Sequence, residues 1–188
     1  MEKIYDNFLD NEEMNDILNV MTSNDFPWFI NPTNDYNLFE TDGDENTYES
    51  FQLTHSFIRN GTKNSEFSRI STNLLNRFSE KSGVRFEHVE RVKANLQTKL
   101  ERREDAYNTP HIDQLMSNYK VLIYYVNDSD GDTFIFDRRM GDTKGAYRIL
   151  KRITPKKGRF LLFDNEYYHS GTNPLETDSR IVINFNFL

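Results

Sequence analysis

The hydrophobic pattern of the chain changes from helical to alternating near residue 85. Before that point, two segments at about 11–22 and 66–82 carry apolar residues at intervals of three and four, the spacing of one helix face. Their apolar positions are Met14, Ile17, Leu18 and Met21 in the first, and Ile70, Leu74, Leu75 and Phe78 in the second. Asp10 or Asn11 can cap the first segment and Gly83 can end the second, so both predict amphipathic helices.

Period-two segments after residue 85 predict a sheet. The candidate strands are 87–100, 120–127, 133–136, 146–152, 159–163 and 179–188, separated mostly by Gly, Asp, Asn and Pro. A short edge strand is also expected at 3–7, whereas 24–50 is rich in Asn, Asp and Pro and is expected to be mostly loop. Helices followed by many short strands predict an α+β domain, a double-sheet barrel with helices packed on one face.

Length and composition fit a single domain. The chain has 188 residues, of which 36% are hydrophobic and 14% aromatic, enough for one sizeable core. We expect one domain over 1–188, with 1–85 as a helical support region and 86–188 as the core. The sequence has no cysteine, which excludes disulfides and thiolate metal sites. The oligomeric state stays open.

The net charge of the chain argues against some classes of binding partner. A net charge of −7 makes nucleic acid a poor partner, because such binding depends on neutralising phosphates. Basic residues nevertheless gather in one stretch, which is either a solvated region or a docking surface for an acidic partner. They are Arg138, Arg139, Lys144, Arg148, Lys151, Arg152, Lys156, Lys157 and Arg159. The sequence has no apolar run of the ~20 residues that cross a bilayer and no signal-peptide pattern, so we expect a soluble, cytoplasmic protein without a membrane partner.

Two histidines and one aspartate stand in a pattern that suits a metal. His111 and Asp113 are two residues apart, so in an extended segment they point to the same side, and Pro110 favours an extended backbone before it. His169 follows the strand expected at 159–163 and a short turn, which places it at the mouth of the barrel. Two imidazoles and one carboxylate on one face of a metal, with open positions opposite, form the facial triad of non-haem iron oxygenases. We therefore expect His111, Asp113 and His169 to bind one Fe(II) ion.

The last strand adds a candidate anion site. Its alternation places Arg180, Val182, Asn184 and Asn186 on one face and Ile181, Ile183, Phe185 and Phe187 on the other. If the polar face lies in water, it needs no partner. If it lies inside, Arg180 can hold a carboxylate as a two-pronged donor. The metal-binding pattern upstream favours the inward orientation.

The order of these residues resembles that of the iron(II)- and 2-oxoglutarate-dependent dioxygenases. Within them, it is most similar to the prolyl 4-hydroxylase-like group, including phage and bacterial members. The resemblance consists of a His-x-Asp pair, a distal His, and an Arg about ten residues later. Supporting segments are 5–9, 123–127, 158–163 and 169–174, together with 130–134, which resembles a Gly-Gly-Glu-Thr turn with two departures. The motifs cover 109–188 well and the first 85 residues loosely.

The resemblance implies a double-stranded β-helix, or jelly-roll, core with the N-terminal helices packed on one sheet and the metal near one end. It implies that 2-oxoglutarate chelates the iron and that Arg180 holds its far carboxylate, where many prolyl hydroxylases use Lys. Tyr125 and Thr133 match positions that often help to hold that carboxylate, although both also suit a core. Asn95 and Gln97 share one face of a strand entering the site and stand where relatives carry Tyr. Ascorbate is an optional further cofactor.

The implied reaction converts 2-oxoglutarate to succinate and CO2 while a substrate is hydroxylated. Halogenating relatives replace the carboxylate ligand, so Asp113 favours hydroxylation. The resemblance favours a peptidyl proline as substrate, with other peptides and small molecules also open. Segments 24–50, 101–108 and 137–148 are candidate lids or substrate walls.

Two alternatives stay open at this stage. One is a jelly-roll binding module whose metal is structural or lost, without oxygenase activity. The other is a zinc hydrolase on the same ligands, which would need a general base near the metal and would leave Arg180 without a role.

Overall fold

The computed structural model describes residues 2–31, 46–142 and 147–188. Its helices are α1 (Asn11–Met21) and α2 (Ser68–Ser82). Its strands are β1 (Lys3–Tyr5), β2 (Phe29–Asn31), β3 (Thr47–Tyr48), β4 (Gln52–Arg59), β5 (Thr62–Lys63), β6 (Val89–Thr98), β7 (Tyr107–Asn108), β8 (Lys120–Tyr125), β9 (Thr133–Arg139), β10 (Ile149–Ile153), β11 (Phe160–Asp164), β12 (Tyr167–Gly171) and β13 (Ser179–Phe187).

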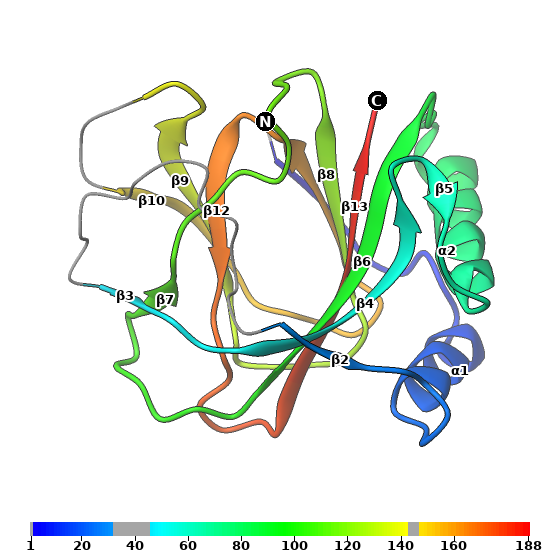
Figure 1. Ribbon diagram of the computed structural model, residues 1–188, viewed down its shortest axis with the longest axis horizontal. Helices are drawn as coiled ribbons and strands as arrows, with labels where there is room; N and C mark the ends of the chain where they lie inside the picture. Colours follow the sequence, from blue (N-terminus) through cyan, green and yellow to red (C-terminus); the bar gives the residue numbers. More distant parts are fainter. Residues whose placement is uncertain (1, 32–45, 143–146) are drawn as a thin grey trace.

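Two antiparallel sheets face each other, and both helices lie on the outer side of the larger one (Figure 1). The larger sheet has the order β1-β11-β8-β13-β6-β4-β2, with β5 attached to β4. The smaller sheet has the order β10-β9-β12, and the short strands β3 and β7 pair in parallel beside it. The expected α+β fold with a jelly-roll core and helices on one sheet is therefore confirmed.

Most of the elements expected from the sequence are present within a few residues, but two important strands were missed. The segment of β4 contains Gln52 and His55 at buried positions, so its hydrophobic alternation is broken. The segment of β12 is rich in Tyr, His, Ser and Gly, so the sequence predicts a turn before His169 but no strand around it. Strands also occur inside 24–50, at β2 and β3; the rest of that loop, at 32–45, and the expected strand start at Ala146 lie outside the described residues.

The core is divided by the larger sheet. On its outer face, the side chain of Phe78 from α2 is fully buried and packs against Tyr5 and Phe160, with ring centroids 5.0 Å away in each case. Between the sheets, a second cluster combines residues of both, including Ile123 and Ile135. The helices thus stabilise the larger sheet by packing on its outer face, and its inner face is available for functional residues.

The basic stretch is largely neutralised within the molecule. Four of its side chains form ion pairs at 2.6–3.2 Å: Arg139 with Glu166, Arg148 with Asp137, Lys151 with Glu2, and Arg159 with Asp6. The guanidinium of Arg138 is buried and lies 4.7 Å from the ring centre of Tyr147. These contacts favour a solvated structural region over a docking surface, while Lys144 lies outside the described residues. Within the part of the chain described, no helix is long and apolar enough to cross a membrane.

The turn that leads into β13 is organised by Asp130. Its carboxylate accepts hydrogen bonds from the backbone N–H groups of Leu175, Glu176 and Thr177 at 2.9–3.0 Å and from the Thr177 hydroxyl at 2.6 Å. Burial by itself raises the pKa of the Asp130 carboxyl, but these hydrogen bonds outweigh burial and lower the pKa well below its usual range. The turn is therefore tied to an ionised carboxylate.

Replacing Phe78 with Ala should lower the free energy of unfolding by about 3–5 kcal/mol, because it leaves a cavity between α2 and the sheet. The matched control is Phe29→Ala, since that side chain is 62% exposed and its loss should change stability by about 0.5 kcal/mol or less. Urea titration followed by circular dichroism measures both. Equal midpoints for the two variants would contradict the packing described above.

Asp130→Asn should destabilise the protein at pH 7 by about 2 kcal/mol, the scale of hydrogen bonds to a charged group. Because the pKa of Asp130 is lower in the folded state, its contribution is complete above the unfolded pKa of about 3.9 and is lost as the pH falls below it. The difference in unfolding free energy between wild type and variant should therefore decrease as the pH is lowered from about 4. A difference that stays constant over this interval would argue against the ionised turn.

Candidate metal centre

The two histidines are brought together by a backbone bridge. His111 lies just after β7 and His169 lies in β12, and each donates its N–H to the carbonyl of the other at 2.9 Å. This closely spaced antiparallel pair holds the two imidazoles side by side, with ring centroids 4.6 Å apart. The side-by-side placement depends on strand pairing across 58 residues of sequence rather than on local spacing.

Asp113 completes the cluster. One ligand atom from each of His111, Asp113 and His169 lies within 4.8 Å of the other two. The Nε2 atoms of His111 and His169 lie 3.9 Å and 3.7 Å from the Asp113 carboxylate oxygens. The Nδ1 atoms face the carbonyls of Thr109 and Tyr167 at 3.2 Å and 3.5 Å. A carbonyl only accepts, so Nδ1 carries the proton and Nε2 is the nitrogen that faces the metal position.

The carboxylate of Asp113 is buried but strongly supported. Its side chain is 4% exposed and accepts hydrogen bonds from Arg91 at 2.6 Å and from Asn184 and Asn186 at 2.9 Å each. Burial raises the pKa of the Asp113 carboxyl, but the charge of Arg91 and the nearby histidines outweigh burial and lower it far below the usual range. The group is therefore ionised, as a metal ligand must be. Two imidazoles and an ionised carboxylate, arranged in this way, fit an iron(II) ion.

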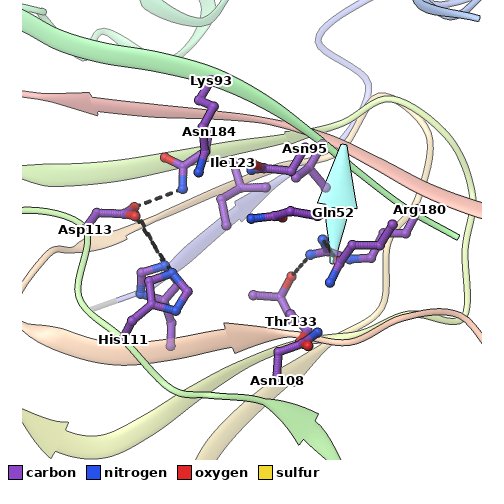
Figure 2. A pocket seen from close by; sticks show the side chains of 14 residues that line it. Gln52, Lys93, Asn95, Asn108, His111, Asp113, Ile123, Thr133, Arg180 and Asn184 are labelled. Atoms are coloured by element: carbon purple, nitrogen blue, oxygen red, sulfur yellow. Dashed lines mark hydrogen bonds and ion pairs between the residues drawn. The ribbon is translucent and has the colours of Figure 1, made fainter. Parts of the chain in front are cut away.

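Arg180 is buried at the other end of the same pocket (Figure 2). It donates to the Gly131 carbonyl at 2.7 Å, to Gln97 Oε1 at 3.0 Å and to Thr133 Oγ1 at 2.8 Å. Among the described residues, no carboxylate forms an ion pair with it. Burial lowers the pKa of the Arg180 guanidinium, so its charge is costly where it stands. An anion in the pocket would offset that cost.

Two glycines make room for the Arg180 side chain. A Cβ on Gly171 would lie 3.1 Å from Arg180 Nη1, and a Cβ on Gly131 would lie 2.9 Å from Arg180 Cδ. The Gly131 position would also place a Cβ 2.5 Å from a backbone carbonyl oxygen, closer than real contacts allow. Gly131, before β9, and Gly171, at the end of β12, therefore allow the close approach of the guanidinium.

The other residues expected at the site take different positions. Thr133, Asn95 and Gln97 line the pocket with the triad and Arg180. Tyr125 lies behind Thr133 and donates to its hydroxyl at 2.8 Å; burial raises the pKa of Tyr125 to about 12 and keeps it protonated. The Oδ1 atom of Asn95 is enclosed and has no hydrogen-bond partner among the described residues. It marks a place where a bound molecule or water is needed.

Several lining residues were not identified from the sequence. Gln52, Lys93, Asn108 and Ile123 line the pocket, and Arg91 supports Asp113 from outside it. Arg91 and Lys93 had a usable signal, because they share the polar face of β6 with Asn95 and Gln97 at period two. Gln52 and Asn108 had none, since each reaches the pocket through pairing with a distant strand.

The comparisons with known proteins agree with this geometry. Residues 98–188 match the family model described as the 2OG-Fe(II) oxygenase superfamily. A search of curated proteins gave no match. Among solved structures, an oxidoreductase of the 2OG-Fe(II) oxygenase family from Burkholderia pseudomallei aligns with a TM-score of 0.64 and 13% identity, covering 99% of this chain and 84% of its own.

Two further similar structures are prolyl hydroxylases. That of Trichoplax adhaerens, in complex with a hypoxia inducible factor oxygen degradation domain peptide fragment, aligns with a TM-score of 0.60 and 14% identity, covering 100% of this chain and 83% of its own. The prolyl-4-hydroxylase of Pseudomonas putida aligns with a TM-score of 0.54 and 13% identity, covering 99% and 91%. At such identities, these likenesses show the fold alone.

Fe(II) and 2-oxoglutarate are the cofactors typical of the matched family, and the residues for the metal are present. Residues 98–188 match the model of the 2OG-Fe(II) oxygenase superfamily, and the jelly-roll fold and the triad of His111, Asp113 and His169 have the arrangement that an enzyme of that superfamily needs.

Proposed function

We propose that the protein is a 2-oxoglutarate-dependent hydroxylase in which His111, Asp113 and His169 hold Fe(II) and Arg180 holds the far carboxylate of 2-oxoglutarate. The observation that carries this proposal is the buried guanidinium of Arg180. It lines the pocket of the triad and, within the described ranges, has no carboxylate partner. A dicarboxylate with one end at the metal would bring its other carboxylate to this cation.

Besides the triad, the pocket offers 2-oxoglutarate two basic side chains, Arg180 and Lys93, and several neutral polar ones. Thr133 and Gln97 both contact the Arg180 guanidinium, so they hold its two terminal nitrogens in fixed directions. Tyr125 fixes the Thr133 hydroxyl from behind. We propose that Thr133 and Arg180 contact the far carboxylate of 2-oxoglutarate directly, with Tyr125 and Gln97 orienting these two side chains. Asn95 would face the middle of the 2-oxoglutarate.

When bound, iron and 2-oxoglutarate supply the oxidising chemistry that places oxygen on a substrate C–H bond. The chain itself supplies three things. The two imidazoles and Asp113 would hold the metal from one side and would leave the other side for small ligands. Arg180 orients the co-substrate through its charge. The packed strands around the pocket, represented by Ile123 and Val182, restrict water beside the reacting atoms.

The substrate class is proposed from resemblance rather than from the pocket. The carboxylate of Asp113 favours hydroxylation over halogenation. Two of the similar structures are prolyl hydroxylases, so a peptidyl proline is the first class to test. We also propose that 1–188 act as one domain, because β1, β2 and β4 from the first 85 residues complete the larger sheet.

The two alternative functions, a metal-binding module and a zinc hydrolase, differ from the proposed one in that neither requires Arg180. A jelly-roll module that only binds metal, or a zinc hydrolase, has no use for a buried cation within the pocket. Burying it without an anion would cost stability and give nothing in return. The charge at Arg180 therefore favours the oxygenase over both.

Arg180→Met should raise the dissociation constant for 2-oxoglutarate roughly tenfold to hundredfold, the value of losing hydrogen bonds to a charged group. Its affinity for Mn(II) should be unchanged, since the triad is untouched. The measurement is anaerobic titration of the Fe(II) protein with 2-oxoglutarate, followed by the visible charge-transfer band. The control is Arg159→Met, an arginine of the Asp6 ion pair that does not line the pocket. Unchanged metal-dependent activity in Arg180→Met would instead support a hydrolase.

Succinate release should increase when the correct substrate class is added to the protein with Fe(II), 2-oxoglutarate and ascorbate. We expect proline-containing peptides to stimulate it more than free amino acids. His111→Ala is the control, because loss of one ligand should reduce release to background. Stimulation only by free amino acids or other small molecules would exclude the peptidyl substrate. Failure of every candidate together with absence of the charge-transfer band would favour a binding module.

A further inference from the structure

The metal-binding carboxylate is held by an arginine that the triad pattern does not include. Arg91 lies in β6, 22 residues before Asp113, and its Nη2 donates to Asp113 Oδ1 at 2.6 Å. The side chain of Arg91 is 26% exposed, whereas that of Asp113 is 4% exposed. A charged donor thus reaches from the edge of the site to a buried ligand.

Arg91 also sets the orientation of a second donor. It lies directly opposite Asn186 in the pairing of β6 with β13, and its Nε donates to Asn186 Oδ1 at 2.8 Å. Because the amide oxygen of Asn186 accepts this hydrogen bond, the amide nitrogen of Asn186 points to the other side, away from Arg91. The Asn186 nitrogen donates to Asp113 Oδ2 at 2.9 Å. Arg91, Asn186 and Asp113 therefore form a closed ring of hydrogen bonds.

The number of donors limits how Asp113 can bind a metal. An ionised carboxylate offers about four acceptor sites, two on each oxygen. Asn184 and Asn186 both donate to Oδ2, and Arg91 donates to Oδ1. Three of these sites are occupied by protein donors, which leaves one on Oδ1 for the metal.

We propose that Arg91 is a positioning residue: it holds Asp113 directly at Oδ1 and, by orienting Asn186, keeps Oδ2 occupied, so that a metal would bond to Asp113 through Oδ1 alone. This inference rests on the proposed function and goes beyond the triad. If each of the three ligands supplied one atom, an octahedral ion would keep three positions for further ligands. If Asp113 bound through both oxygens, one of these positions would be lost.

The test uses the metal-free full chain and compares Arg91→Met with wild type. Isothermal titration calorimetry should show that the dissociation constant for Mn(II) is roughly tenfold to hundredfold higher in Arg91→Met than in wild type, as expected when a hydrogen-bond partner of a metal ligand is removed. The absorption spectrum of the Co(II)-substituted protein should also change, because the coordination of the ion changes. Arg91→Lys keeps the charge but not the two-pronged contact, so it should restore the affinity only in part. The matched control is Arg159→Met, which removes a similarly exposed ion pair away from the pocket.

The outcomes separate this inference from the proposed function. Mn(II) affinity within twofold of wild type and an unchanged Co(II) spectrum in Arg91→Met would overturn the role of Arg91 alone. A lower unfolding free energy with the same spectrum would also overturn it, since that is the result of a purely structural contact. Absence of metal binding in wild type would overturn the proposed function itself. If Arg91→Met does not fold, Asn186→Ala is judged by the same two measurements.

Discussion

The burial of the Asp113 carboxylate is the constraint on which the rest of the site depends. Moving an ionised carboxylate out of water is costly unless charges and hydrogen bonds replace the lost solvation. Here three donors from two neighbouring strands, β6 and β13, replace it. His111 lies 3.9 Å from Asp113 Oδ1 and His169 lies 3.7 Å from Oδ2, so a divalent cation between these groups would complete the compensation.

A single strand connects this carboxylate with the anion site. The inward face of β13 carries Arg180 at one end of the pocket and Asn184 and Asn186 at the other. Because a strand advances about 3.3 Å per residue and Asn184 is the fourth residue after Arg180, their positions are separated by about 13 Å along the backbone. The rigid backbone of β13, paired on both sides, thus sets the distance between the buried cation and the metal ligands.

The two faces of the larger sheet differ in polarity and in what they contact. The outer face is covered by α1 and α2 through aromatic and aliphatic side chains around Phe78, and this packing keeps the strands in register. The inner face carries polar residues that an ordinary core would exclude. Arg180, Gln97 and Asn186 are all less than 5% exposed there. The apolar outer layer therefore supports a polar interior that would be unstable alone.

The sequence by itself predicted the helices, most of the strands, the residues of the triad and the inward position of Arg180. Each of these depends on a local period or on a short motif that can be recognised along the chain. The alternation over 180–187, together with the metal-binding pattern upstream, also predicted that a polar face would lie inside, but not which residues it would contact. Only the tertiary structure decided that Asn184 and Asn186 hold Asp113, since their partner is more than 70 residues away. The same reason hid Gln52, which β4 brings to the pocket by pairing with β6. The alternation of β6 placed Arg91 on a polar face, but only the pairing with β13 brings it to Asn186. Local patterns record which side of a strand faces inward, whereas register between strands decides which residues meet.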